Sequence, residues 1–155
     1  RRCPSPTTSA TPWPPPGALV LAGGCGQTRV LTAAAPPPWA TAGFTGAPLV
    51  PWALSDSGQS LAYLFAKQLV AGVREDGTSN KVLWVMKGMG TLRVTAHPAA
   101  GAVPSIEIGG QMTNVNQLPT PVDLPAAGCW SFDLSWGKTA DHMSLQVLPQ
   151  GPLLN

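Results

Sequence analysis

The fold is decided by one stretch of the chain, Ala127-Gly128-Cys129-Trp130-Ser131-Phe132-Asp133-Leu134-Ser135-Trp136-Gly137. Its large apolar residues occupy alternate positions, 130, 132, 134 and 136, and small or polar residues separate them. Such alternation is typical of a half-buried β-strand, in which successive side chains point to opposite faces. Two indoles, a phenyl ring and a leucine on one face need an opposing layer to cover them. We therefore expect this strand to lie at the centre of a β-domain.

Working outward, the same two-residue period recurs in short segments separated by turn residues. We expect seven or eight strands, over residues 49–54, 61–65, 82–86, 92–96, 105–108, 122–124, 129–136 and 143–147. A helix over residues 59–69 also fits its apolar spacing. The segment 82–86 is apolar on both sides, which predicts a central strand. Gly88-Met89-Gly90 predicts a hairpin turn after it, and residues 114–121 read as a loop.

Many short strands at this spacing indicate an antiparallel sandwich, and we expect an immunoglobulin-like one over residues 48–150. A corner before the main strand favours that class. Ala126-Ala127-Gly128-Cys129-Trp130 has the shape of the tyrosine corner of such folds, with Ala for Asp and Trp for Tyr. An indole has an N–H donor but no hydroxyl, so the usual corner hydrogen bond is not implied.

The chain carries little charge for its 155 residues. Charged residues make up 10% and the formal net charge is +2. This balance gives no basic stripe, so we expect no nucleic-acid partner. The sequence also has no run of about 18 apolar residues that would predict a membrane-spanning helix.

Residues 1–47 differ in composition from the rest. Nine of the first 38 residues are proline, including two Pro-Pro-Pro triplets, and the segment has no acidic residue. Proline at this density predicts a disordered or extended leader and tether. An apolar run, Gly17-Ala18-Leu19-Val20-Leu21-Ala22-Gly23-Gly24-Cys25, resembles the end of a bacterial lipoprotein signal peptide, which makes Cys25 a candidate lipidation site. The alternatives are a plain secretory signal and a Gly/Ala-rich linker.

Three blocks of sequence resemble a group of bacterial secreted and lipoprotein domains that have no assigned activity. They are residues 57–65 (SGQSLAYLF), residues 80–85 (NKVLWV) and the pattern Gly128-Cys129-Trp130…Leu134-Ser135-Trp136-Gly137. The group shares Asn-Lys-(Ile/Val)-Leu-Trp-Val and Gly-Cys-Trp…Leu-x-Trp-Gly, and the resemblance covers residues 49–148. It departs at Gln59-Ser60, where the group tends to have Asn-Ala, and at Ala127, where it tends to have Pro. The resemblance implies an exported immunoglobulin-like domain and implies nothing about chemistry.

Cys129 is the most distinctive polar candidate. It could be a reactive thiol, a metal ligand or a small buried residue, and a bridge to Cys25 would exclude lipidation there. Three cysteines at 3, 25 and 129 suggest no disulfide framework. Together with His97, His142 and Met143, Cys129 matches the ligand types of a blue-copper site, but the spacing argues against it. We expect no cofactor.

Two acidic pairs are candidates for hydrolytic chemistry or calcium: Asp133 with Asp141, and Glu107 with Asp123. Solvated surface charges are the simpler interpretation of both. Among the six tryptophans, 84, 130 and 136 are expected in the core. Trp13, Trp39 and Trp52 lie in or beside the tail, where exposed indoles could stack on sugars or a partner, or could be incidental.

These features predict a non-enzymatic, exported β-sandwich, anchored to the outer face of the cytoplasmic membrane through a lipid on Cys25. We expect it to act as a monomeric binding or structural module for a protein or glycan ligand. The alternative functions are a carbohydrate-active module or small hydrolase using Asp133 and Asp141, and a metal-binding redox protein.

Overall fold

The computed structural model describes residues 13–72, 74, 80–100 and 105–150. In these residues the chain forms β-strands and one short 3-10 helix, η1 (Pro38–Ala40). The strands are β1 (Leu19–Leu21), β2 (Val30–Thr32), β3 (Trp52–Leu54), β4 (Ser60–Leu64), β5 (Leu69–Val70), β6 (Lys81–Pro98), β7 (Ile106–Pro121), β8 (Gly128–Trp136) and β9 (Thr139–Leu148). The all-β class expected from the sequence is confirmed, and the helix considered over residues 59–69 does not form.

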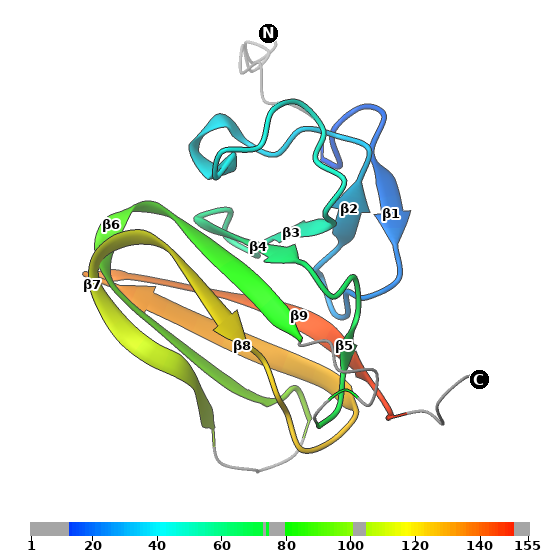
Figure 1. The fold of residues 1–155 in the computed structure, drawn as a ribbon, viewed down its shortest axis with the longest axis vertical. Coiled ribbons are helices and arrows are strands. Elements are labelled where there is room, and N and C mark those ends of the chain that lie inside the picture. Colours follow the sequence, from blue (N-terminus) through cyan, green and yellow to red (C-terminus); the bar gives the residue numbers. More distant parts are fainter. Residues whose placement is uncertain (1–12, 73, 75–79, 101–104, 151–155) are drawn as a thin grey trace, which may run out of the picture.

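A long antiparallel ribbon of β6 and β7 is the spine of the fold (Figure 1). β7 follows one edge of β6 along most of its length. On the other edge, β4 pairs with the first part of β6 and β8 pairs with the second part. From β4 the sheet continues through β3 and β2 to β1, and from β8 it continues through β9 to β5, which is parallel to β9. The result is one curled open sheet, so an immunoglobulin-like sandwich of two separate sheets is not confirmed.

The glycines of β6 bend the strand where the sequence predicted a hairpin. The β6–β7 register shifts between Val85 and Gly90, and twice more before Val94, which marks bulges in the ribbon. Gly88 has φ +95, a left-handed value that glycine adopts without strain. Gly90 packs against Trp136, since an added Cβ would lie 3.4 Å from the Trp136 Cβ. The predicted hairpin and the predicted loop over residues 114–121 are therefore wrong, because β7 supplies a partner that continues past the bend.

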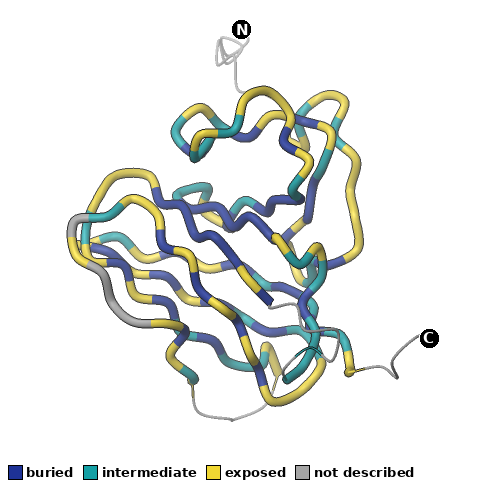
Figure 2. The backbone as a smooth tube through the Cα atoms, viewed as in Figure 1, coloured by how far each residue is buried: buried dark blue, intermediate teal, exposed yellow. Residues whose placement is uncertain are grey.

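The bend folds the two parts of the sheet around a shared core. The alternate residues of β8 all point into it, with Trp130 and Phe132 at 1% and 0% exposure and Leu134 and Trp136 at 1% and 4%. The opposite wall carries Trp84, whose ring centroid lies 5.4 Å from that of Phe132 and whose Nε1 donates to Thr120 Oγ1 at 2.9 Å. The expected core tryptophans are thus confirmed. Figure 2 shows the same alternation as buried and exposed segments along these strands.

A second apolar cluster lies on the other face of β3, β4 and the start of β6, where the N-terminal segment packs against the sheet. Leu31, Ala34 and Ala40 are buried there against Trp52, Leu61, Tyr63, Leu83 and Val85. Tyr63 donates to the Ala40 carbonyl at 2.5 Å, and burial raises the pKa of Tyr63 to about 12. Residues 82–86 are therefore buried on both sides, as expected of a central strand. The expectation of a disordered tail is wrong for residues 13–47, because their apolar side chains cover a sheet face; residues 1–12 lie outside the described residues.

The corner before β8 is closed by an indole. Trp130 Nε1 donates to the Ala126 carbonyl at 2.9 Å, and Gly128 has φ +131. The bond is local, four residues back along the chain, and it uses the indole N–H where a tyrosine corner uses a hydroxyl. After Trp136, β8 and β9 are joined by a tight turn through Gly137 and Lys138.

Candidate functional site

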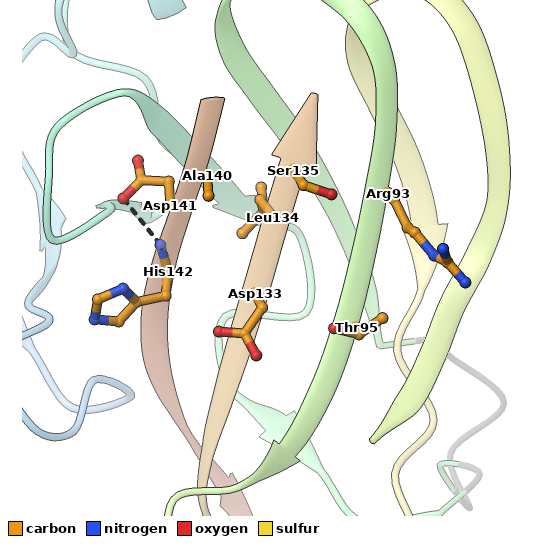
Figure 3. Close-up of a pocket in the computed structure, with 8 residues that line it drawn as sticks. All are labelled: Arg93, Thr95, Asp133, Leu134, Ser135, Ala140, Asp141 and His142. Carbon is orange, nitrogen blue, oxygen red and sulfur yellow. Dashed lines mark hydrogen bonds between the residues drawn. The ribbon is translucent and has the colours of Figure 1, made fainter. Parts of the chain in front are cut away.

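Polar side chains collect on the outer face of β6, β8 and β9, opposite the core. The alternation that buries Trp130 and Leu134 turns their neighbours outward. Register places Asp133 of β8 between Thr95 of β6 and His142 of β9. An open hollow of about 460 Å³ lies here, lined by Arg93, Thr95, Asp133, Leu134, Ser135, Ala140, Asp141 and His142 (Figure 3).

One imidazole–carboxylate pair lies on this face. His97 Nε2 is 3.0 Å from Asp133 Oδ2, and His97 Nδ1 is 3.0 Å from the Pro98 carbonyl. Both ring nitrogens therefore face acceptors, which fixes the ring in place. Beside the pair, Arg93 Nε lies 3.6 Å from Glu107 Oε1, with both side chains about half exposed. A surface pair of this kind contributes little stability, on the order of 0–1 kcal/mol.

A second pair joins the face to the turn that follows β3. His142 Nε2 lies 2.9 Å from Asp56 Oδ2, and Thr28 Oγ1 donates to Asp56 Oδ1 at 3.2 Å. The Asp56 amide in turn donates to the His142 carbonyl at 2.9 Å. Three segments distant in sequence therefore hold the Asp56 carboxylate in one position, next to a surface from which ligands can approach.

Asp141 is buried beneath the same face and organises this turn. It accepts hydrogen bonds from the hydroxyls of Ser55 and Ser60 and from the amides of Ser57, Gln59 and His142. Burial pushes the pKa of Asp141 upward, but the bonds from Ser55, Ser57 and the His142 amide outweigh burial, so the pKa is lowered. The carboxylate is thus held ionised with its acceptors filled. Its position, on the core side, makes it a positioning group for the turn that carries Asp56.

A disulfide joins the N-terminal segment to β8. Cys25 is bonded to Cys129 on the outer side of β8, with Cα atoms 6.0 Å apart. The segment around Cys25 also pairs with β9, because the Cys25 amide donates to the Ser144 carbonyl at 3.2 Å and the Gln146 amide to the Gly23 carbonyl at 2.8 Å. A sulfur in a disulfide cannot carry a thioether-linked lipid. The disulfide is therefore incompatible with a lipid on Cys25, and it is the bridge to Cys129 that the sequence left open as an alternative.

The structure does not assemble either acidic pair. Asp133 is exposed on the outer face, whereas Asp141 is buried and accepts a hydrogen bond from Ser60 at the start of β4. A glycosidase holds its two carboxyls on either side of one bond, whereas the Asp141 carboxylate is engaged by five hydrogen bonds from Ser55, Ser60 and three backbone amides. Glu107 lies at the start of β7 and Asp123 lies beyond its end, so a strand of 16 residues separates them.

The four copper-type ligands are also dispersed. Cys129 is in the disulfide, Met143 is buried in the core, and His142 points to the outer face. Within the described part of the chain, no group of three or more His, Cys, Asp or Glu side chains is placed to hold a metal ion. The described segments likewise contain no helix long and apolar enough to cross a bilayer.

The sequence alone did not reveal the roles of Asp56, Thr28 and Ser60. Asp56 stands in a Ser-Asp-Ser-Gly cluster that is typical of any turn. The available signal was the density of short polar side chains in that turn, immediately before a buried strand. Polar groups at such a position need hydrogen-bond partners.

Comparison with known proteins gives little further information. No family model matches the chain, and no curated protein matches it. One solved structure, described as that of a "Putative Lipoprotein from Bacillus anthracis", is 14% identical and covers 63% of this chain and 78% of its own, with a TM-score of 0.45. A likeness at this level supports no statement about fold or function. The resemblance to the group of secreted and lipoprotein domains therefore stays a prediction.

Proposed function

We propose that this chain is an exported, non-enzymatic binding module that holds a protein or glycan ligand on the outer face of β6, β8 and β9. The observation that carries the proposal is the open hollow on that face, whose polar groups are fixed by the sheet and by the two imidazole–carboxylate pairs. Rigid groups bind with a small loss of side-chain entropy, which favours recognition at a surface of this kind.

Binding is a better interpretation than catalysis because of what the imidazoles contact. Both nitrogens of His97 face acceptors, and Nε2 of His142 faces Asp56. A general base that activates a serine needs a ring nitrogen directed at the hydroxyl. The buried Asp141 is engaged by five hydrogen bonds on the core side, which supports a structural role for it.

The disulfide supports an extracellular or cell-surface location, since such bonds persist in oxidising compartments. With the Cys25 thiol engaged, the module reaches the cell surface without a lipid on that residue. It acts as a monomer.

The test is a binding screen with matched surface variants. The purified full chain is presented to a glycan array and to a peptide display library. In the first variant, Thr95→Lys/Ser135→Lys, two charges enter the hollow at outward-facing positions. In the control, Leu49→Lys/Met89→Lys, the same charges enter at side chains that are 95% and 67% exposed elsewhere. We expect binding that the first variant loses and the control keeps. Failure of the wild type to bind in either screen would overturn the proposal.

A further inference from the structure

A second hollow lies on the other side of Asp56. It has a volume of about 330 Å³ and is lined by the turn after β3 and by the N-terminal segment, with Trp13, Gln27, Arg29, Leu54, Asp56 and Ser57 in its wall. Asp56 connects it to the outer face, because the same carboxylate pairs with His142. The two hollows are thus linked by a pair of residues in contact, Asp56 in the wall of this hollow and His142 in the wall of the other.

Trp13 gives this hollow an exposed and fixed aromatic surface. Its side chain is 47% exposed, whereas the tryptophans at 52, 84, 130 and 136 are buried. The ring is held edge-on against Trp52, with centroids 6.0 Å apart and planes at 62°. Trp52 is itself fixed by donation of its Nε1 to the Ala34 carbonyl at 3.1 Å. Because Trp13 stays about half exposed beside this contact, part of its indole is available to a flat, partly apolar ligand.

The polar groups around Trp13 are planar and of both hydrogen-bonding types. Arg29 brings guanidinium donors, Asp56 brings carboxylate acceptors, and Gln27 brings an amide that is both donor and acceptor. Asp56 is oriented by Thr28 and His142, and Arg29 Nη1 reaches the Gly26 carbonyl at 3.5 Å. A small-molecule site usually combines an apolar or aromatic wall with a few polar groups in fixed positions.

We propose that this hollow is a saccharide subsite, in which a pyranose ring stacks on Trp13 and its hydroxyls bond Asp56, Arg29 and Gln27. A pyranose presents an apolar C–H face and a rim of hydroxyls that both donate and accept, so it complements an indole bordered by planar polar groups. The proposal deepens the proposed binding function, on which it rests, by naming a glycan as the ligand. Because Asp56 contacts His142 of the outer-face hollow, one oligosaccharide can extend from the Trp13 hollow toward the outer face.

The experiment is isothermal titration calorimetry of the full chain with cellohexaose and with hexa-N-acetylchitohexaose. The two sugars have the same linkage, and only the second carries N-acetyl groups. Trp13→Ala removes the stacking surface. Arg29→Ala removes an exposed donor without touching the core. Phe65→Ala is the matched control, an exposed aromatic that is 42% accessible and does not line the hollow. We expect wild-type binding of at least one sugar, roughly tenfold weaker after Trp13→Ala, weakened by Arg29→Ala and unchanged by Phe65→Ala.

Absence of wild-type binding to both sugars overturns the subsite, as does binding that Trp13→Ala and Arg29→Ala leave unchanged. If binding to the glycan array is instead lost only in Thr95→Lys/Ser135→Lys, the outer face remains the binding surface and the Trp13 subsite is refuted alone. A folded melting transition for each variant separates loss of a contact from loss of structure.

Discussion

Removal of the Cys25–Cys129 disulfide tests the central claim that the N-terminal segment belongs to the fold. The bond spans 104 residues of sequence. In the chain-entropy treatment, a closed loop of about this length restricts the unfolded chain by about 4.7 kcal/mol at 25 °C. Because removal of a native disulfide from a small domain typically costs about 2–5 kcal/mol, we expect Cys25→Ser/Cys129→Ser to lower the free energy of unfolding by about 3 kcal/mol.

The expected loss of stability comes from the greater freedom of the unfolded chain, because other contacts keep the N-terminal segment in place in the folded state. The bonds of Gly23 and Cys25 to β9 remain, and Thr28 Oγ1 still accepts from the Ser144 amide at 2.8 Å. The double variant should therefore fold to the same structure. With a urea m-value of about 2 kcal/mol/M, its unfolding midpoint should fall by roughly 1.5 M.

Urea denaturation followed by tryptophan fluorescence measures this shift, for the oxidised wild type, the wild type with reductant and the double variant. Cys3→Ser is the control and should match the oxidised wild type. Equal midpoints for the oxidised wild type and the double variant would refute the reasoning. So would thiol alkylation that labels Cys25 and Cys129 in native protein, or a lipid-sized mass on Cys25.

Three further predictions test the packing. Asp141→Asn removes a buried anion that accepts five hydrogen bonds and should lower the free energy of unfolding by about 3 kcal/mol at neutral pH. Because the pKa of Asp141 is lowered in the folded state, the extra stability of the wild type should be lost as pH falls below about 4. The melting temperatures of the wild type and Asp141→Asn, measured against pH, should therefore converge below that pH. In a double-mutant cycle of Trp84→Phe and Thr120→Val, urea midpoints should give a coupling of about 1 kcal/mol for the indole–hydroxyl bond, and additive effects would contradict it. Gly24→Ala would place a Cβ 2.3 Å from the Thr28 carbonyl oxygen, so the tight turn beside Cys25 must shift; we expect a loss of about 2 kcal/mol by thermal melting, and an unchanged melt would show that the turn is not as described.

The local pattern predicted the strands whose two faces differ most. β8 and β9 alternate cleanly; β8 begins one residue before its expected bounds, whereas β9 begins four residues earlier than expected, at Thr139, and ends one residue later. The pattern failed for β6 and β7. Glycines at 88 and 90 fit a hairpin and a bend equally well, and the choice depends on whether a partner strand continues alongside. Residues 114–121 are polar and contain proline, so only their pairing with β6 makes them a strand.

The candidate site could be predicted only in part, because its groups come from segments far apart in the chain. Asp133 and His142 were visible as polar positions in alternating strands. The partners that fix the site, Asp56 and Thr28, gave no comparable signal, since a polar turn has the same composition whether or not it contacts a sheet. The burial of Asp141 beneath the face that carries Asp133 was not predicted, because the expected last strand began at residue 143 and left Asp141 outside the alternating pattern.

The sequence by itself determined the β class, the buried face of β8 and the central position of residues 82–86, because the two-residue period of side chains is a local property. Tertiary structure alone decided that residues 13–47 cover a sheet face, that Cys25 meets Cys129, and that one bent strand replaces a hairpin. Each of these depends on a contact between residues distant in sequence, and a local pattern does not contain the free energy of such a contact.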